Sequence, residues 1–137
     1  MAIAAIDYGK RRLGIAAADD AGTIVYPAGL IERKSLKLDL ARLTSRLGEL
    51  EATRVIIGLP LNMNGSAGPA ARAAEKFAHD LHLATGLPVE LHDERLSTFE
   101  AEERLRGLSG RRRRTGEVDA VAAIVILESW LSKTGRL

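Results

Sequence analysis

Residues 1–20, MAIAAIDYGKRRLGIAAADD, decide the fold of this chain, because they contain two short apolar runs separated by a polar turn. The runs at 2–7 and 12–18 are typical of buried strands, and the gap between them has the length of a hairpin loop. A third apolar run at 23–31 follows after another hairpin-sized gap. The start of the chain is therefore predicted to form three neighbouring antiparallel strands.

The next part of the chain has helical periodicity. Ser35 is a helix cap, and the leucines after it recur at steps of four and three, which predicts an amphipathic helix. That stripe consists of Leu36, Leu40, Leu43, Leu47 and Leu50. Gly68 and Pro69 begin a second helix that runs to Gly86. Its predicted buried face comprises Ala70, Ala74, Phe77 and Leu81.

Two further strands, at 54–59 and 88–92, complete the predicted sheet. The first is apolar throughout, as expected for a strand covered on both faces. Two more helices are predicted, one beginning at Ser97 and one over 118–132. The order βββαβαβαα predicts an α/β fold in a single domain, 1–137. Its five-stranded mixed sheet has three antiparallel and then two parallel strands and is flanked by helices.

The composition limits the possible functions. Hydrophobic residues make up 46% and charged residues 28% of the 137 positions, which is typical of a globular protein. Aromatic residues make up only 4%, so base stacking on aromatic side chains is not expected as a main mode of nucleic-acid binding. The absence of cysteine excludes disulfides and thiol catalysis and fits a reducing cytoplasm. We expect a cytoplasmic protein without a signal peptide or a membrane span.

Three acidic positions lie at the ends of predicted elements. Asp7 ends the first strand, and Asp119 begins the last helix. The last strand ends at Asp93 or Glu94, between which strand alternation does not decide. If these carboxylates converge, Mg²⁺ or Mn²⁺ would offset their repulsion, and two such ions can activate a water against a phosphodiester. Taken singly, the acids also have ordinary explanations: a turn hydrogen bond, the helix dipole, or an ion pair with Arg95.

Basic residues are concentrated next to two of these acids. They favour phosphate binding, because a guanidinium can donate two parallel hydrogen bonds to one phosphate. A solvated surface loop is the alternative explanation. The clusters predict contact with a nucleic-acid backbone without preference for base sequence. The residues are Lys10, Arg11 and Arg12 after Asp7, and Arg104, Arg106, Arg111, Arg112, Arg113 and Arg114 before Asp119.

Four segments of the chain resemble motifs of the YqgF/RuvX family of bacterial Holliday junction resolvases. DYGKRRLGIA, at 7–16, is similar to the family's first signature, D-x-G-x-[KR]-R-[IL]-G-x-A. IIGLPLNMNGSAG at 56–68, DERLST at 93–98 and VDAVAAIVIL at 118–127 are similar to its second, third and fourth motifs. The four matches are collinear and span nearly the whole chain, which makes the resemblance specific.

The resemblance implies an RNase H-like fold and a nuclease with a two-metal site for Mg²⁺ or Mn²⁺. It implies that Asp7, Glu94 and Asp119 are the catalytic and metal-binding residues. The family is implicated in 5′-end processing of the 16S ribosomal RNA precursor as well as in junction resolution. Asn64 and Ala67 stand where the family commonly has Asp and Glu, so a functional acid in that loop is not expected here.

Three functions are compatible with the sequence. The leading prediction is a metal-dependent nuclease acting on structured RNA or branched DNA. An ATPase or sugar kinase of the actin-like clan also uses D-x-G after a first strand, but it usually needs two such domains. A non-catalytic RNA- or ribosome-binding module would keep only the basic surface. The chain is expected to act as a monomer or homodimer, with Trp130 and Leu131 as candidate dimer contacts, and His92 is expected at the surface.

Overall fold

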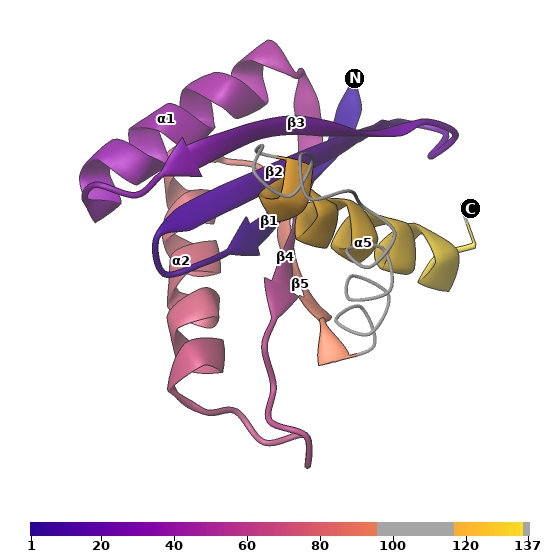
Figure 1. Ribbon diagram of the computed structural model, residues 1–137. Coiled ribbons are helices and arrows are strands. Elements are labelled where there is room, and N and C mark those ends of the chain that lie inside the picture. Colours follow the sequence, from indigo (N-terminus) through magenta and orange to yellow (C-terminus); the bar gives the residue numbers. More distant parts are fainter. Residues whose placement is uncertain (96–116, 136–137) are drawn as a thin grey trace.

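The computed structural model describes residues 1–95 and 117–135 (Figure 1). The helix predicted from Ser97, together with Arg104, Arg106 and Arg111 to Arg114, lies outside the described residues. Within the described ranges, no helix is both long and apolar enough to cross a membrane. The elements are β1 (Ala2–Tyr8), β2 (Arg12–Asp19), β3 (Val25–Glu32), α1 (Leu36–Glu49), β4 (Ala52–Leu59), α2 (Pro69–Thr85), β5 (Val89–Asp93) and α5 (Glu117–Lys133).

The strands form one mixed sheet in the order β3-β2-β1-β4-β5. β2 pairs antiparallel with both β1 and β3, whereas β4 pairs parallel with both β1 and β5. The predicted sheet of three antiparallel and then two parallel strands is therefore confirmed. Because β1, β4 and β5 run in the same direction, their C-terminal ends meet at one end of the sheet, where open α/β sheets carry their sites.

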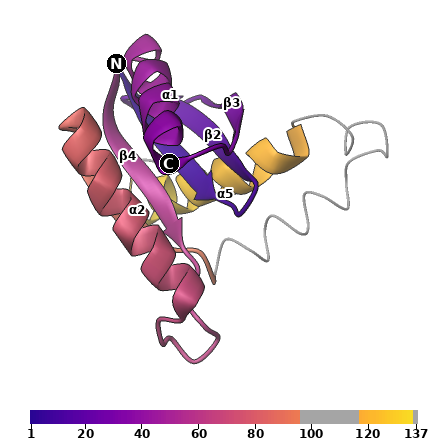
Figure 2. The same cartoon turned by 90° about the vertical axis from the view of Figure 1, so that its left-hand side faces the viewer.

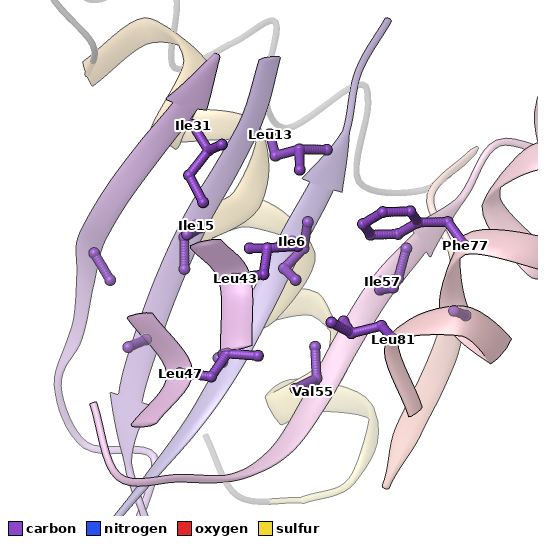
Figure 3. Close-up of a cluster of buried hydrophobic side chains, with 14 residues drawn as sticks. Ile6, Leu13, Ile15, Ile31, Leu43, Leu47, Val55, Ile57, Phe77 and Leu81 are labelled. Carbon is purple, nitrogen blue, oxygen red and sulfur yellow. The ribbon is translucent and has the colours of Figure 1, made fainter. Parts of the chain in front are cut away.

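Helices cover both faces of the sheet. α1 and α2 pack on one face, around the hydrophobic core drawn in Figure 3, and α5 packs on the other (Figure 2). β4 is buried from Val55 to Gly58, as predicted for a strand covered on both sides. Along β1, Ile6 faces α1 and α2, whereas Ile3 and Ala5 face α5. The same alternation directs Asp7 to the α5 face.

Two of the predicted helix faces need correction. In α1, Leu36 is 42% exposed, whereas Asp39 is only 1% exposed. The charge of Asp39 is accommodated because the Arg33 side chain lies 3.4 Å from its Oδ2 atom. In α2, Ala71 is buried and Ala70 is exposed, because the apolar stripe begins with a step of three residues and not four. The helices themselves begin and end where the sequence predicts.

Two predictions about β5 and α5 are wrong. Trp130 and Leu131 are 2% and 0% exposed, so they belong to the core and are not available as dimer contacts. The Trp130 indole N–H donates to the Glu90 carboxylate at 2.9 Å. His92 is 6% exposed and its Nε2 atom lies 2.8 Å from Ser129 Oγ. His92 is buried because α5, which is mainly apolar, covers this face of the sheet. The two acids that follow His92 in the sequence gave no sign of this burial.

Candidate active site

Asp7 and Glu94 lie together at the C-terminal ends of β1 and β5. Asp7 is the last but one residue of β1, and Glu94 directly follows β5. The Glu94 amide donates to the Leu59 carbonyl oxygen at 3.1 Å, which holds the residue after β5 against the end of β4. The negative charge of Asp7 contributes to raising the pKa of Glu94, so the two carboxylates are close neighbours.

Gly58 provides the space between these two strands. β4 lies between β1 and β5, and Gly58 faces α5 like Ile56 two residues earlier. A Cβ atom at position 58 would collide with the Glu94 carboxylate and would lie 2.7 Å from Cδ1 of Ile126. Glu94 therefore occupies, from the neighbouring strand, the volume that a β4 side chain would take. Sequence reasoning missed this residue, although a glycine inside an apolar strand is the signal of such a close approach.

The surroundings of Glu94 raise its pKa from an ordinary 4.5 to about 7. Burial of the carboxyl group is the largest cause, followed by the negative charge of Asp7 and then by that of Asp93. Near neutral pH the Asp7–Glu94 pair therefore favours taking up positive charge, either as a proton or as a cation. Carboxylate oxygens are the ligands that Mg²⁺ and Mn²⁺ prefer. The donor atoms of this pair thus fit a hard divalent ion.

Asp93, the residue before Glu94, has Arg95 as its partner. It forms an ion pair with Arg95, at 2.7 Å between Nη2 and Oδ2, and the Arg95 amide donates to its Oδ1 at 3.0 Å. The side-chain hydrogen bond from Arg95 is the main reason why the pKa of Asp93 is lowered. Arg95 also donates to the Met63 carbonyl oxygen at 3.3 Å, which links the end of β5 to the loop 60–68. The ion pair with Arg95 that the sequence allowed for either Asp93 or Glu94 is therefore formed by Asp93.

Asp119 belongs to the first turn of α5, the helix that covers this face of the sheet. Position 119 precedes Ile126, the neighbour of Gly58, by seven residues or about two helical turns. The side chain of Asp119 lies outside the described part of the structure. Among the side chains that are described, no group of three or more His, Cys, Asp or Glu residues could hold a metal ion. The described site is thus the Asp7–Glu94 pair, and the role of Asp119 stays a prediction.

A cleft of about 320 Å³ opens beside Asp7, and we call it the cationic cleft. Gly9 permits its tight turn, because a Cβ atom there would lie 2.6 Å from the Arg12 carbonyl oxygen. The basic side chains of the turn are exposed, so three positive charges stand next to the carboxylate of Asp7. The second predicted cluster, Arg111 to Arg114, lies outside the described residues. The lining residues of the cleft are Asp7, Gly9, Lys10, Arg11, Arg12 and Gly14.

Glu94 should make the stability of the metal-free protein depend on pH. Because its pKa is higher in the folded chain than the ordinary 4.5, folding favours the protonated form. The stabilisation from this proton is complete below pH 4.5 and is lost as the pH rises to about 7. Urea unfolding in EDTA should show the free energy of unfolding falling across this window in the wild type, and a flatter profile in Glu94→Gln. Parallel profiles for the two proteins would contradict the raised pKa.

The chain matches known proteins along nearly its full length. Residues 1–133 match the family model described as RuvX: Holliday junction resolvase. A protein of Anaeromyxobacter sp. (strain Fw109-5), provisionally named a pre-16S rRNA nuclease, is 51% identical over 128 residues, which cover 92% of this chain and 93% of that protein.

Two solved structures share the fold of this chain. Thermus thermophilus RuvC in complex with a Holliday junction has a TM-score of 0.63 at 16% identity, covering 98% of this chain and 96% of that one. The Fowlpox virus resolvase in complex with Holliday junction DNA has a TM-score of 0.58 at 11% identity, covering 98% and 99%. These likenesses confirm the RNase H-like fold that the sequence motifs imply.

Proposed function

Because the chain belongs to the RuvX family, we propose that it is a divalent-metal-dependent nuclease that hydrolyses phosphodiester bonds of structured nucleic acid in the cytoplasm. The observation that carries the proposal is the Asp7–Glu94 pair, in which burial and the charge of Asp7 raise the pKa of Glu94 to about 7. Two neighbouring carboxylates destabilise a fold unless a proton or a cation accompanies them, which favours metal binding. The cationic cleft adds positive charge beside the pair, where a phosphate backbone would lie.

Structured RNA is the substrate class that the relatives favour. The Anaeromyxobacter protein that is provisionally named a pre-16S rRNA nuclease is 51% identical to this chain, whereas the two resolvase structures are 16% and 11% identical. The proposed reaction is therefore 5′-end processing of the 16S ribosomal RNA precursor. Resolution of four-way DNA junctions is the second candidate, and the description of the family model favours it.

The proposed roles of the residues follow from their positions. Asp7 and Glu94, together with Asp119, would hold one or two divalent ions. Such ions, when bound, supply an activated water and stabilise the leaving oxygen of the phosphodiester. Glu94 must lose its proton before its oxygens can act as ligands, so metal binding would release that proton and weaken as the pH falls below about 7. The basic residues of the cationic cleft would neutralise the substrate phosphates and orient the strand over the carboxylates.

Removal of the metal tests this proposal on two labelled substrates. One is a 16S precursor fragment that carries its 5′ extension, and the other is a four-way DNA junction. We expect the RNA to be cut in Mg²⁺ or Mn²⁺, and EDTA should abolish the cutting because the carboxylates alone cannot activate a water. Cutting of the junction alone would assign the second candidate function. Binding of RNA without cutting in any divalent metal would contradict a nuclease and leave a non-catalytic module.

A further inference from the structure

A basic surface continues from the cationic cleft onto the segment that leads from β3 into α1. β2 and β3 pair antiparallel with Arg12 opposite Glu32, and beyond this pair the Arg33 amide donates to the Arg11 carbonyl oxygen at 2.8 Å. The residues after β3 therefore lie directly beside the β1–β2 turn that lines the cleft (Figure 1). Two segments that are distant in the sequence thus form one edge of the molecule.

Arg33 holds the two segments together. Its Nη1 atom donates to the Gly9 carbonyl oxygen at 3.1 Å, and its guanidinium lies 4.6 Å from the centroid of the Tyr8 ring. On the other side, its Nε atom lies 3.4 Å from Oδ2 of Asp39, a side chain that is 1% exposed. Asp39 also accepts a hydrogen bond from the Lys34 amide at 2.9 Å, which sets the course of the chain before α1. The relative position of the two segments is therefore determined by partly buried contacts.

The exposed basic side chains along this edge do not stabilise the fold locally. Lys34 and Lys37 are exposed and, like Lys10 and Arg11, make no ion pair with any described residue. Lys34 lies just before the N-cap of α1 and Lys37 lies in its first turn, where the helix dipole disfavours positive charge. The nearby buried acid, Asp39, is already paired with an arginine. Unpaired cations that continue from the cationic cleft are the footprint expected of a phosphate-binding surface.

We propose that a nucleic-acid strand bound in the cationic cleft continues over Arg11 onto Lys34 and Lys37, which bind phosphates outside the cleavage site. The inference rests on the proposed function and extends its substrate-binding surface. Contacts that are remote from the scissile phosphate stabilise the bound substrate and the transition state equally. Their loss should therefore raise KM and leave kcat nearly the same.

The test compares two double variants that lose the same charge. Lys34→Gln/Lys37→Gln removes the proposed contacts, and Lys76→Gln/Lys133→Gln removes two exposed lysines from α2 and from the last turn of α5. Affinity for the precursor RNA fragment and for the four-way junction is measured in EDTA at several salt concentrations. The slope of log affinity against log salt should become shallower by about 1.4–1.8 in the first variant only, since each phosphate contact contributes about 0.7–0.9. Its KM in the cleavage assay should rise while its kcat stays close to that of the wild type.

The outcomes separate this inference from the proposed function. Equal salt slopes in the two double variants, with cleavage by the wild type intact, would overturn the extended surface alone. A shallower slope in the first variant, in a protein that binds but does not cut, would support the surface and contradict the nuclease. Wild-type protein that binds neither substrate would overturn both.

Discussion

Asp7→Asn should lower the rate of cleavage by about 10³-fold, the size of effect seen when a group that stabilises developing charge is removed. Asparagine keeps the shape of the side chain but removes the charge, so the proposed divalent ion would lose one of its two carboxylate ligands. The change should also lower the pKa of Glu94, because the charge of Asp7 is one cause of its rise. Single-turnover cleavage with excess enzyme measures the effect without interference from product release.

The matched control is Asp20→Asn, which makes the same chemical change at an exposed position in the turn after β2. It should cleave at the wild-type rate. Substrate binding in EDTA should be no weaker in Asp7→Asn than in this control, because removing a negative charge does not repel a phosphate backbone. Full activity of Asp7→Asn would show that the Asp7 carboxylate is not needed for cleavage.

Gly58→Ala should reduce cleavage by about 10²-fold, although the substituted residue carries no functional group. The added Cβ atom would collide with the Glu94 carboxylate and press on Ile126, so the carboxylate must move. A displacement of about 1 Å in a catalytic group can lower the rate by about that factor. Cleavage rates and Mn²⁺ affinity measured together should fall in this variant, because both depend on the position of Glu94 in the proposed site.

Gly48→Ala is the control for Gly58→Ala. A Cβ atom at position 48, in α1, would meet nothing within 4 Å, so this change should stabilise the helix by about 0.5–1 kcal/mol and leave cleavage unchanged. A second comparison separates displacement of Glu94 from general destabilisation. Gly58→Ala combined with Glu94→Gln should be no less active than Glu94→Gln alone, because both changes act through one carboxylate. Additive losses would show that Gly58 acts in another way.

Local sequence patterns predicted most of the fold. The apolar runs at 2–7 and 54–59 match strands that are covered on both faces, and the hairpin-sized gaps match the antiparallel order of the first three strands. Helical periodicity also predicted most of the buried face of α1 and α2, including Leu43, Leu47 and Phe77, but it misplaced the buried residue in the first turn of each helix. Asp39 is buried because the Arg33 side chain lies against it, and hydrophobic periodicity contains no information about such a pairing.

The candidate site could be predicted only in part. Asp7 could be identified from the sequence because it is an acid at the end of a buried strand. The choice of Glu94 over Asp93 came from the motif resemblance. The physical reason for that choice is a contact between strands, since the Glu94 side chain lies over Gly58 on β4. His92 was misjudged for a similar reason, because its partner Ser129 belongs to a helix 37 residues further along the chain. Such long-range contacts leave no local pattern.

The position of a bound Mn²⁺ ion tests the central claim most directly. Crystals soaked in Mn²⁺ above pH 7, where Glu94 is ionised, allow the ion to be located by its anomalous scattering. We expect Mn²⁺ within about 2–2.5 Å of carboxylate oxygens of both Asp7 and Glu94, with Asp119 as a further ligand. An ion bound only at other residues, or no ion between Asp7 and Glu94 in a protein that cuts nucleic acid, would contradict the account.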